Sequence, residues 1–213
     1  LTLDYLNKGK KVVMLGGDHS TPLGYIQALA TKYPSFGVLH IDAHADLRKA
    51  YEHFNYSHAS IMYNILEEVK EVSKLVQVGI RDFCDEEKER IDNHPKIKTF
   101  FNQHIKDRMY EGETWKQIVD DIISNLPNQI YISFDIDGLD PKLCPNTGTP
   151  VPGGFEIEQV FYLLKKIKES GKKIIGFDLN EVSSGGEFVD TIDPLVGARV
   201  LYKMCNIFMS QKN

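Results

Sequence analysis

Acidic and imidazole side chains are concentrated in four short segments, each of which follows a run of apolar residues. The segments are Gly16–His19, His40–Asp46, Ser133–Asp140 and Phe177–Glu181. Carboxylates and imidazoles bind divalent cations, and they also serve as general acids and bases. A lone Asp-x-Asp is more often a loop cap, and a lone histidine is more often structural. The joint occurrence of these segments at predicted strand ends nevertheless favours a site for chemistry.

The spacing inside the segments would place several carboxylates side by side. Alternate side chains of an extended chain share a face, so every second residue of Asp42–Asp46 can project the same way, as can Asp135 and Asp137. If the strands are neighbours, like charges gather at one edge of a sheet, which is unfavourable unless cations are bound. We therefore expect two divalent ions and one cluster of ligands: His19, Asp42, His44, Asp46, Asp135 and Asp137.

The types of these side chains also indicate the metal and the reaction. Carboxylate and imidazole without thiolate suit a fairly hard ion such as Mn²⁺ better than a cysteine-rich zinc site. Two ions bridged by carboxylates lie roughly 3.5–4 Å apart and can share a hydroxide, whose parent water ionises near neutral pH. His40 has the same parity as Asp42 and His44, so it could point towards this site from deeper in its strand.

The elements that position these residues alternate between short β-rich runs and longer helical patterns. We predict strands at 11–15, 36–41, 75–79, 97–101, 129–134 and 173–179, and helices at 20–33, 61–72, 85–93, 113–126, 156–168 and 193–209. This alternation indicates a mostly parallel sheet with helices on both faces. Ligands of such sheets bind outside the carboxyl ends of the strands. No repeat or linker interrupts the pattern, so we expect a single domain over 1–213.

Composition narrows the partners and the compartment. The chain has 213 residues with 42% hydrophobic residues and a net charge of -5, so a sizeable core is available and nothing indicates a nucleic-acid partner. The odd number of cysteines, three, fits a reducing compartment. With no run long enough to cross a bilayer, we expect a cytoplasmic protein without a membrane partner. Because the chain opens on Leu1 and not on methionine, we also expect the native protein to continue upstream.

The motifs resemble those of the arginase/agmatinase (ureohydrolase) family over nearly the whole chain. The matching motifs are Gly-Gly-Asp-His, Asp-Ala-His-Ala-Asp, Ser-Phe-Asp-Ile-Asp-Gly-Leu-Asp-Pro and Gly-Thr-Pro-x-Pro-Gly-Gly. The resemblance implies a three-layer α/β/α fold, a centre of two Mn²⁺ ions per chain, and hydrolysis of a guanidino substrate to release urea. It also implies a homo-oligomer, either a trimer or a hexamer.

The resemblance further implies a role for each metal ligand. Two carboxylates would bridge the ions, and each ion would take one further pair of ligands. The bridging residues would be Asp42 and Asp135, and the pairs would be His19 with Asp46 and His44 with Asp137.

Three more positions match the family. Glu181 falls where a carboxylate holds the substrate guanidinium, a cation with paired planar donors, although a loop acid is the plainer interpretation. His58 matches the histidine that passes a proton to the leaving amine, with nearby His53 as a competitor. Thr149 matches a threonine that lines the substrate pocket, unless it only shapes a loop rich in proline and glycine.

The same resemblance narrows the substrate. Arginases have an asparagine-containing stretch after Asp-Ala-His-Ala-Asp and an acid shortly after a later strand, whereas this chain has Leu47–Ala50 and Cys84 there. Agmatine, cleaved to putrescine and urea, is therefore the expected substrate. We expect the outer pocket near Arg48, Tyr56 and Cys84 to determine substrate selectivity. Arginine and other guanidino acids stay open as alternatives.

Two other function classes are less compatible with the sequence. Zinc deacetylases of related fold use a pair of adjacent histidines and one zinc ion, and this chain has no adjacent histidines. An inactive metal-binding scaffold would be expected to lose ligands or the proton shuttle first, and all of them are present. Cys144 follows Asp140 and could approach the pocket, but a thiol has no assigned task there.

Overall fold

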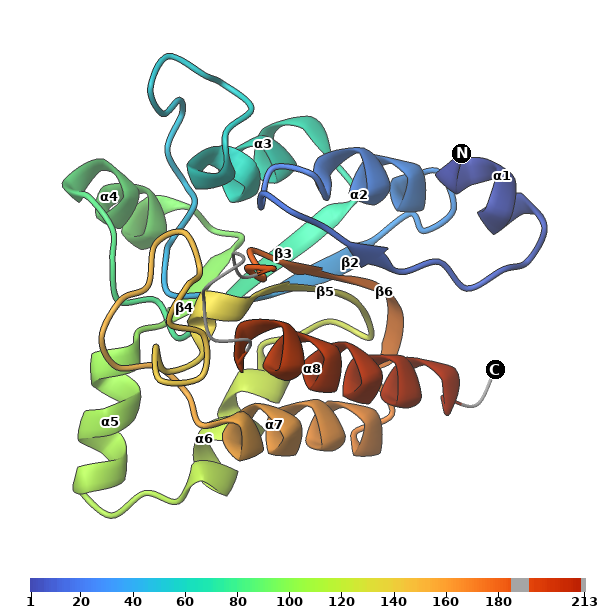
Figure 1. Ribbon diagram of the computed structural model, residues 1–213. Helices are drawn as coiled ribbons and strands as arrows, with labels where there is room; N and C mark the ends of the chain where they lie inside the picture. The colour runs from blue at the N-terminus through green and yellow to red at the C-terminus, as the bar shows by residue number, and fades with distance from the viewer. Residues whose placement is uncertain (185–191, 212–213) are drawn as a thin grey trace.

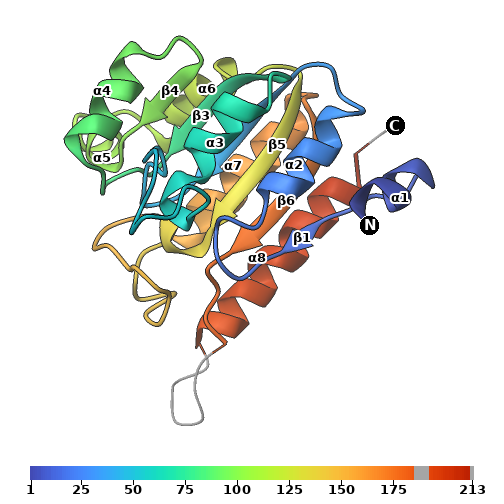
Figure 2. The same ribbon diagram turned by 90° about the horizontal axis from the view of Figure 1, so that it is seen from above.

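A parallel sheet of six strands forms the centre of the computed structural model, which describes residues 1–184 and 192–211. The strands follow the spatial order β1-β6-β5-β2-β3-β4 and pair in parallel throughout. Their bounds are β1 Met14–Leu15, β2 Phe36–Ile41, β3 Val72–Val78, β4 Ile97–Phe100, β5 Gln129–Asp135 and β6 Lys173–Asn180. Figures 1 and 2 show the sheet between two layers of helices.

Helices cover both faces of this sheet. On one side lie α1 (Thr2–Asn7), α2 (Leu23–Ala30) and α3 (Ile61–Glu68), with α4 (Asp85–Asn93) beside them (Figure 1). The other side carries α5 (Asn102–Tyr110), α6 (Trp115–Ser124), α7 (Ile157–Glu169) and α8 (Ile192–Met209). Short 3₁₀ helices occur at η1 (His58–Ser60) and η2 (Ile136–Gly138). The predicted three-layer α/β/α fold is confirmed.

Burial on both faces explains why the central strands read as continuous apolar runs. In β2, Phe36 and Val38 pack with α2 and α3, whereas Leu39 and Ile41 belong to the core on the side of α6 and α7. All six residues of β2 are buried. Within the described residues, no helix is long and apolar enough to cross a membrane.

Several element boundaries differ from the expected ones. The first strand contracts to Met14–Leu15 at the sheet edge, and the helix expected over 61–72 ends at Glu68 because β-branched Val72 already begins β3. Helix α5 was not expected, because only Asn102 and Ile105 are buried and its apolar periodicity is correspondingly weak.

The strand order creates the crevice in which a ligand can bind. From β2 the chain moves outward through β3 and β4, then crosses back to add β5 and β6 on the opposite side of β2. The segments that leave the carboxyl ends of β2 and β5 therefore run in opposite directions. Parallel α/β sheets bind ligands in the crevice that such a divergence opens. Both segments carry the predicted aspartates.

Candidate metal centre and substrate pocket

The predicted ligands lie where β2 and β5 end, but they do not lie there for the expected reason. β2 ends at Ile41, before Asp42, and Asp46 has a left-handed backbone with φ of 54°. β5 ends at Asp135, and Asp137 lies in η2. The expected alternation of an extended chain is therefore wrong for Asp135 and Asp137, because η2 begins directly after Asp135. In the first segment His44 still forms a β-bridge with Asp82, and the departure comes at Asp46. A 3₁₀ turn and a left-handed residue thus help to direct these side chains together.

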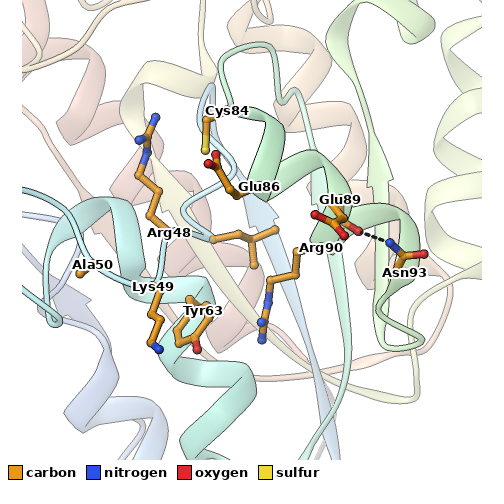
Figure 3. A pocket seen from close by; sticks show the side chains of 10 residues that line it. Arg48, Lys49, Ala50, Tyr63, Cys84, Glu86, Glu89, Arg90 and Asn93 are labelled. Carbon is orange, nitrogen blue, oxygen red and sulfur yellow. Dashed lines mark hydrogen bonds between the residues drawn. The ribbon is translucent and has the colours of Figure 1, made fainter.

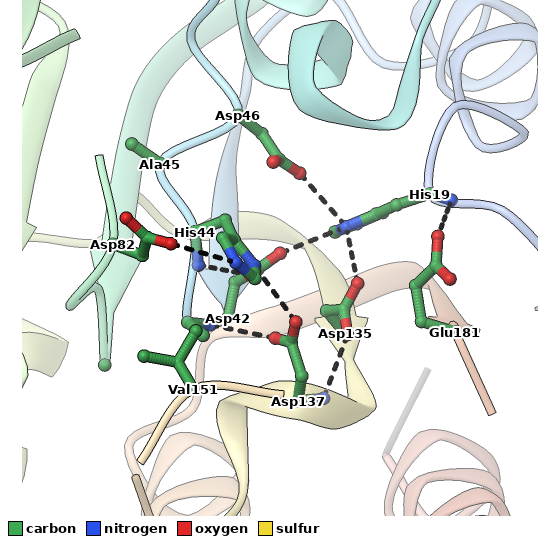
Figure 4. Close-up of polar contacts among 12 residues, drawn as sticks. His19, Asp42, His44, Ala45, Asp46, Asp82, Asp135, Asp137, Val151 and Glu181 are labelled. Carbon is green, nitrogen blue, oxygen red and sulfur yellow. Dashed lines mark hydrogen bonds and ion pairs between the residues drawn. The ribbon is translucent and has the colours of Figure 1, made fainter. Parts of the chain in front are cut away.

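One half of the cluster is centred on His19. Its Nδ1 atom lies 3.0 Å from Asp42 Oδ2, 3.2 Å from Asp46 Oδ2 and 3.2 Å from Asp135 Oδ2 (Figure 4). The imidazole is only 1% exposed, so these groups meet away from bulk water. Three carboxylates and one imidazole thus converge on a single point at the sheet edge.

The other half is centred on His44. Its Nδ1 atom lies 3.0 Å from Asp137 Oδ2 and 3.5 Å from Asp42 Oδ1, so Asp42 presents one oxygen to each half. Asp135 behaves differently: its Oδ2 faces His19, while its Oδ1 accepts a 2.9 Å hydrogen bond from the backbone N–H of Asp137. All six predicted side chains are therefore brought together, and Asp42 is the one that spans both halves.

The donor set fits a cation. Ser133 Oγ donates to Asp178 Oδ1 at 3.0 Å, so this hydroxyl accepts from His19 Nε2 at 2.9 Å. That contact places the ring proton on Nε2 and leaves a lone pair on Nδ1, which has no hydrogen-bond partner among the described residues. A lone pair facing three carboxylate oxygens is a ligand arrangement for a divalent ion.

Protons replace the cation when no metal is bound. Burial alone would lower the pKa of His19, but the facing carboxylates of Asp135, Asp42 and Asp46 raise it well above the ordinary value. Burial also opposes the charged form of His44, yet Asp137 and Asp42 raise its pKa to about 11. Desolvation and neighbouring carboxylates raise the pKa of Asp135. The cluster therefore requires positive charge, which a divalent ion supplies most compactly.

A cavity of about 180 Å³ opens directly onto this cluster, and the three predicted substrate residues line it. They are His58, Thr149 and Glu181, together with His19, His44, Asp46 and Asp135. His58 Nδ1 lies 3.4 Å from Asp18 Oδ2 at the rim. His53, the competing histidine, lies in the tight Tyr51–Phe54 turn with φ of 70° and is not among the described residues that line the cavity.

Glu181 is held in a strained conformation beside the cluster. Its φ of 60° is unfavourable for a residue with a side chain. The backbone is fixed at both ends, because Glu181 N–H donates to Gly17 O and Thr147 Oγ1 donates to Glu181 O, each at 2.8 Å. Its Oε1 accepts from His19 N–H at 2.8 Å, and burial raises the pKa of its carboxyl. The Glu181 carboxylate is thus held in the wall of the cavity beside the cluster.

Two further cavities continue outward from the first. One of about 130 Å³ shares His44, Asp46, His58 and Thr149 with it and adds Tyr51, Arg48, Asp82, Phe83 and Glu87. Arg48 then borders a cavity of about 590 Å³ that also includes Cys84 and Glu86 (Figure 3). Tyr56, in contrast, is 63% exposed and is not among the described residues lining these three cavities, so its expected part in selectivity stays a prediction.

Arg81 is a site residue that the sequence did not reveal. Among the described residues its guanidinium donates to main-chain oxygens only, with Nη2 at 2.7 Å from Asp137 O, 3.2 Å from Leu139 O and 2.9 Å from Val151 O. It therefore ties the segment that carries Asp137 to the loop that carries Thr149. Arginine at the end of a predicted strand was the available signal, but its partners Asp137 and Val151 are 56 and 70 residues away.

Cys144 does not approach the pocket. It is buried in the core on the side of α6 and α7, and its Sγ donates to Ile136 O at 3.3 Å. Burial raises the pKa of this thiol to about 12, so it stays protonated. The other two cysteines, Cys84 and Cys205, are partly buried and free.

Comparison with known proteins gives a consistent set of matches. The model of the arginase family matches residues 2–206. The chain is 40% identical over 186 residues to the N(1)-aminopropylagmatine ureohydrolase of Thermus thermophilus and 29% identical over 196 residues to human arginase-1. It covers 59% of the length of each of these relatives, which in turn match 87% and 82% of the chain.

A solved structure agrees with this result. The agmatine ureohydrolase of Thermoplasma volcanium superposes with a TM-score of 0.79 at 26% sequence identity. The match covers 98% of this chain and 66% of that one.

Proposed function

The chain belongs to the arginase family, and from this premise we propose that it is a manganese-dependent ureohydrolase that cleaves agmatine to putrescine and urea. One observation carries the proposal. The unpartnered Nδ1 lone pair of His19 faces three carboxylates on the floor of a cavity, and Glu181 projects a fixed carboxylate into the same cavity. The floor suits divalent ions, and the wall suits a guanidinium.

Two Mn²⁺ ions are the cofactor that we propose for this floor. His19 and Asp46 would hold one ion, His44 and Asp137 the other, and Asp42 both, with Asp135 as the second shared carboxylate. When bound, such ions lower the pKa of water and supply hydroxide near neutral pH.

The substrate is oriented by groups of the chain itself. Glu181 accepts N–H bonds from the planar guanidinium, which stays cationic at all relevant pH values. Gly148 lies beside this carboxylate, since a Cβ at this position would be 3.6 Å from Glu181 Oε2, an ordinary van der Waals distance. With the guanidinium held between this carboxylate and the cluster, its carbon faces the metal side, where attack forms a tetrahedral centre.

The proton balance of the reaction assigns a task to His58. The attacking hydroxide gives the carbonyl oxygen of urea, and the departing nitrogen must gain a proton to leave as an amine. His58 lies at the cavity rim with Nδ1 3.4 Å from Asp18 Oδ2, so this carboxylate orients the ring. Thr149 adds a hydroxyl to the same wall.

N(1)-aminopropylagmatine is a second candidate substrate, favoured by one specific observation. The catalytic cavity continues past Thr149 and His58 into space lined by Asp82, Arg48 and Glu87. A longer guanidino amine could extend along this path, and the Thermus relative carries that substrate in its name.

A substrate panel tests the proposal. The complete protein with added Mn²⁺ is offered agmatine, N(1)-aminopropylagmatine, arginine and 4-guanidinobutyrate, and urea is measured. We expect urea from one of the two amines at the highest kcat/KM, and none from a Glu181→Gln variant at the same substrate concentration. A clear preference for arginine would reject the agmatinase assignment, and urea from none of them would reject the ureohydrolase assignment. Deacetylation of an acetylpolyamine would favour the zinc deacetylase class.

The remaining proposals concern organisation in the cell. We propose a single catalytic domain over 1–213, a homo-oligomer that is a trimer or hexamer, and a cytoplasmic location. Light scattering on the complete protein measures the molar mass of the assembly and therefore the number of subunits.

A further inference from the structure

A row of polar side chains crosses the buried interior of the sheet directly beneath the cluster. Strand pairing aligns Thr99 of β4 with Gln77 of β3, Gln77 with His40 of β2, His40 with Ser133 of β5, and Ser133 with Asp178 of β6. Gln77, His40, Ser133 and Asp178 are each 0% exposed. Buried polar groups are costly unless they are hydrogen-bonded, so four of them in one register row, continued by the partly buried Thr99, require an explanation.

The first half of the row fixes the orientation of an amide. Thr99 Oγ1 donates to Gln77 Oε1 at 2.9 Å, and Gln77 Nε2 donates to Ala45 O at 2.7 Å. A flipped amide would set its oxygen against the Ala45 carbonyl and its nitrogen against the hydroxyl. The observed orientation is therefore the one in which both ends of Gln77 are satisfied.

This amide in turn fixes the tautomer of His40. Gln77 Nε2 lies 3.0 Å from His40 Nδ1, and because the amide nitrogen can only donate, Nδ1 must accept. The ring proton of His40 is then on Nε2, which donates to Asp42 Oδ2 at 2.7 Å. His40 consequently supports the carboxylate that spans both halves of the cluster.

The second half of the row fixes the same Nε2–H tautomer in His19, but there the other ring nitrogen, Nδ1, faces Asp42. Asp178 accepts from Ser133, and Ser133 accepts from His19 Nε2, so His19 offers its Nδ1 lone pair. The two rings lie 5.4 Å apart between centroids and face the same Asp42 oxygen. One imidazole offers a lone pair and the other offers an N–H.

We propose that Gln77 is a positioning residue that keeps His40 in the Nε2–H tautomer, so that His40 orients Asp42 and stays off the metal. The need is geometric, because His40, His19, Asp42 and Asp46 can all place one ligand atom within 4.8 Å of one another. An imidazole lone pair there would take a coordination position that water requires in a catalytic site. The inference rests on the metal centre of the proposed function.

Binding of Mn²⁺ to the complete protein, measured by calorimetry, is the main test. Loss of a hydrogen-bond partner behind a metal site typically costs roughly 10–100-fold in affinity. We expect a loss of this size in Gln77→Met and a smaller one in Thr99→Val, because Ala45 O still orients the amide. Gln27→Met, an exposed glutamine on α2, serves as the matched control and should leave affinity unchanged.

A double-mutant cycle separates positioning from a general structural role. In a His40→Phe background, Gln77→Met should cause no further loss of Mn²⁺ affinity, since its effect passes through His40. An equal loss with and without His40 overturns the proposal. Thermal unfolding of each variant identifies any that fails to fold, and His40→Gln then replaces His40→Phe.

The tautomer itself is observable by nitrogen NMR of the metal-free wild type. One-bond N–H coupling should assign the His40 proton to Nε2, and a proton on Nδ1 overturns the proposal. This readout also separates the two levels of inference. Mn²⁺ binding without urea release would defeat the proposed function alone, whereas failure to bind Mn²⁺ would leave the NMR result to decide on Gln77.

Discussion

The floor of the site and its outer rim are built in different ways. On the floor, Asp42, Asp135 and Asp137 are at most 5% exposed, and each accepts a backbone or imidazole hydrogen bond. On the rim, Asp82 is 64% exposed and Arg48 is 39% exposed, with loop segments as their support. The sheet thus imposes the geometry that the chemistry needs, while the rim can vary in charge and shape without disturbing it.

The strongest test of this contrast removes a floor carboxylate. Asp42→Asn weakens the negative charge shared by both halves of the cluster, so both metal positions should be lost. Since metal ions supply several kcal/mol of stabilisation, urea release should fall by at least roughly 10³-fold. Metal analysis and a urea assay on the same preparation measure both effects.

Asp140→Asn is the matched control for that change. Asp140 belongs to the sequence motif that carries Asp135 and Asp137, and among the described residues its Oδ1 accepts from Lys142 N–H at 3.0 Å, a bond that asparagine preserves. Two outcomes would contradict the special role of the floor carboxylates. One is that Asp42→Asn keeps its metal, and the other is that both variants lose metal and urea release equally.

A second test falls on the boundary between floor and rim. His58→Ala should lower kcat by roughly 10²–10⁴-fold, because it removes proton transfer to the leaving amine. Metal content should not change, since His58 pairs with Asp18 and contacts no member of the cluster in the described hydrogen-bond and ion-pair network. His53→Ala is the control, and an equal loss there would move the proton-transfer role away from His58.

A third and smaller effect belongs to the rim alone. Arg48 is a cation beside the outward path, and Coulomb attraction across about 6 Å of water is worth roughly 0.7 kcal/mol, or about threefold. Arg48→Ala should therefore raise kcat/KM for agmatine relative to 4-guanidinobutyrate by about threefold to tenfold. Lys49→Ala, whose side chain borders only the outermost cavity, should leave this ratio unchanged. A change in metal content would show instead that the rim supports the floor.

The smallest expected effect concerns the layer beneath the floor and its pH dependence. Burial raises the pKa of Asp178 despite opposing contributions from His19, Tyr131 and Ser133. A raised carboxyl pKa means that the folded state binds the proton more tightly than the unfolded state. The resulting stabilisation is present below the unfolded pKa and is lost as the pH rises through the folded pKa.

Asp178→Asn should remove this dependence, since the amide does not titrate. The free energy of unfolding of the variant, relative to wild type, should therefore become more favourable between pH 4 and pH 8. Urea denaturation at several pH values measures the difference. A constant difference across this range would indicate that Asp178 keeps an ordinary pKa.

The sequence predicted the architecture and the cluster but not the contacts that hold them. Strands that are buried on both faces appear in the sequence as continuous apolar runs. Helix α4 spans Asp85–Asn93 as expected, because this charged stretch has clear ends in the sequence. Helix α5 escaped prediction because it buries few residues. The roles of Arg81 and Gln77 could not be predicted, since the partners of Arg81 and the register row of Gln77 arise only when distant segments pair.

The attachment of Arg81 has a consequence for how such a protein can diverge. In the part of the chain that the structure describes, this guanidinium binds only the main-chain oxygens of Gly79, Asp137, Leu139 and Val151. These bonds therefore do not depend on which side chains the loop between Leu139 and Val151 carries. Substitutions along that loop can therefore accumulate while its path past the metal floor is retained. A lineage could thus acquire a new substrate preference one residue at a time. A loop of equal length grafted from a related protein would still be held by Arg81 of the recipient protein.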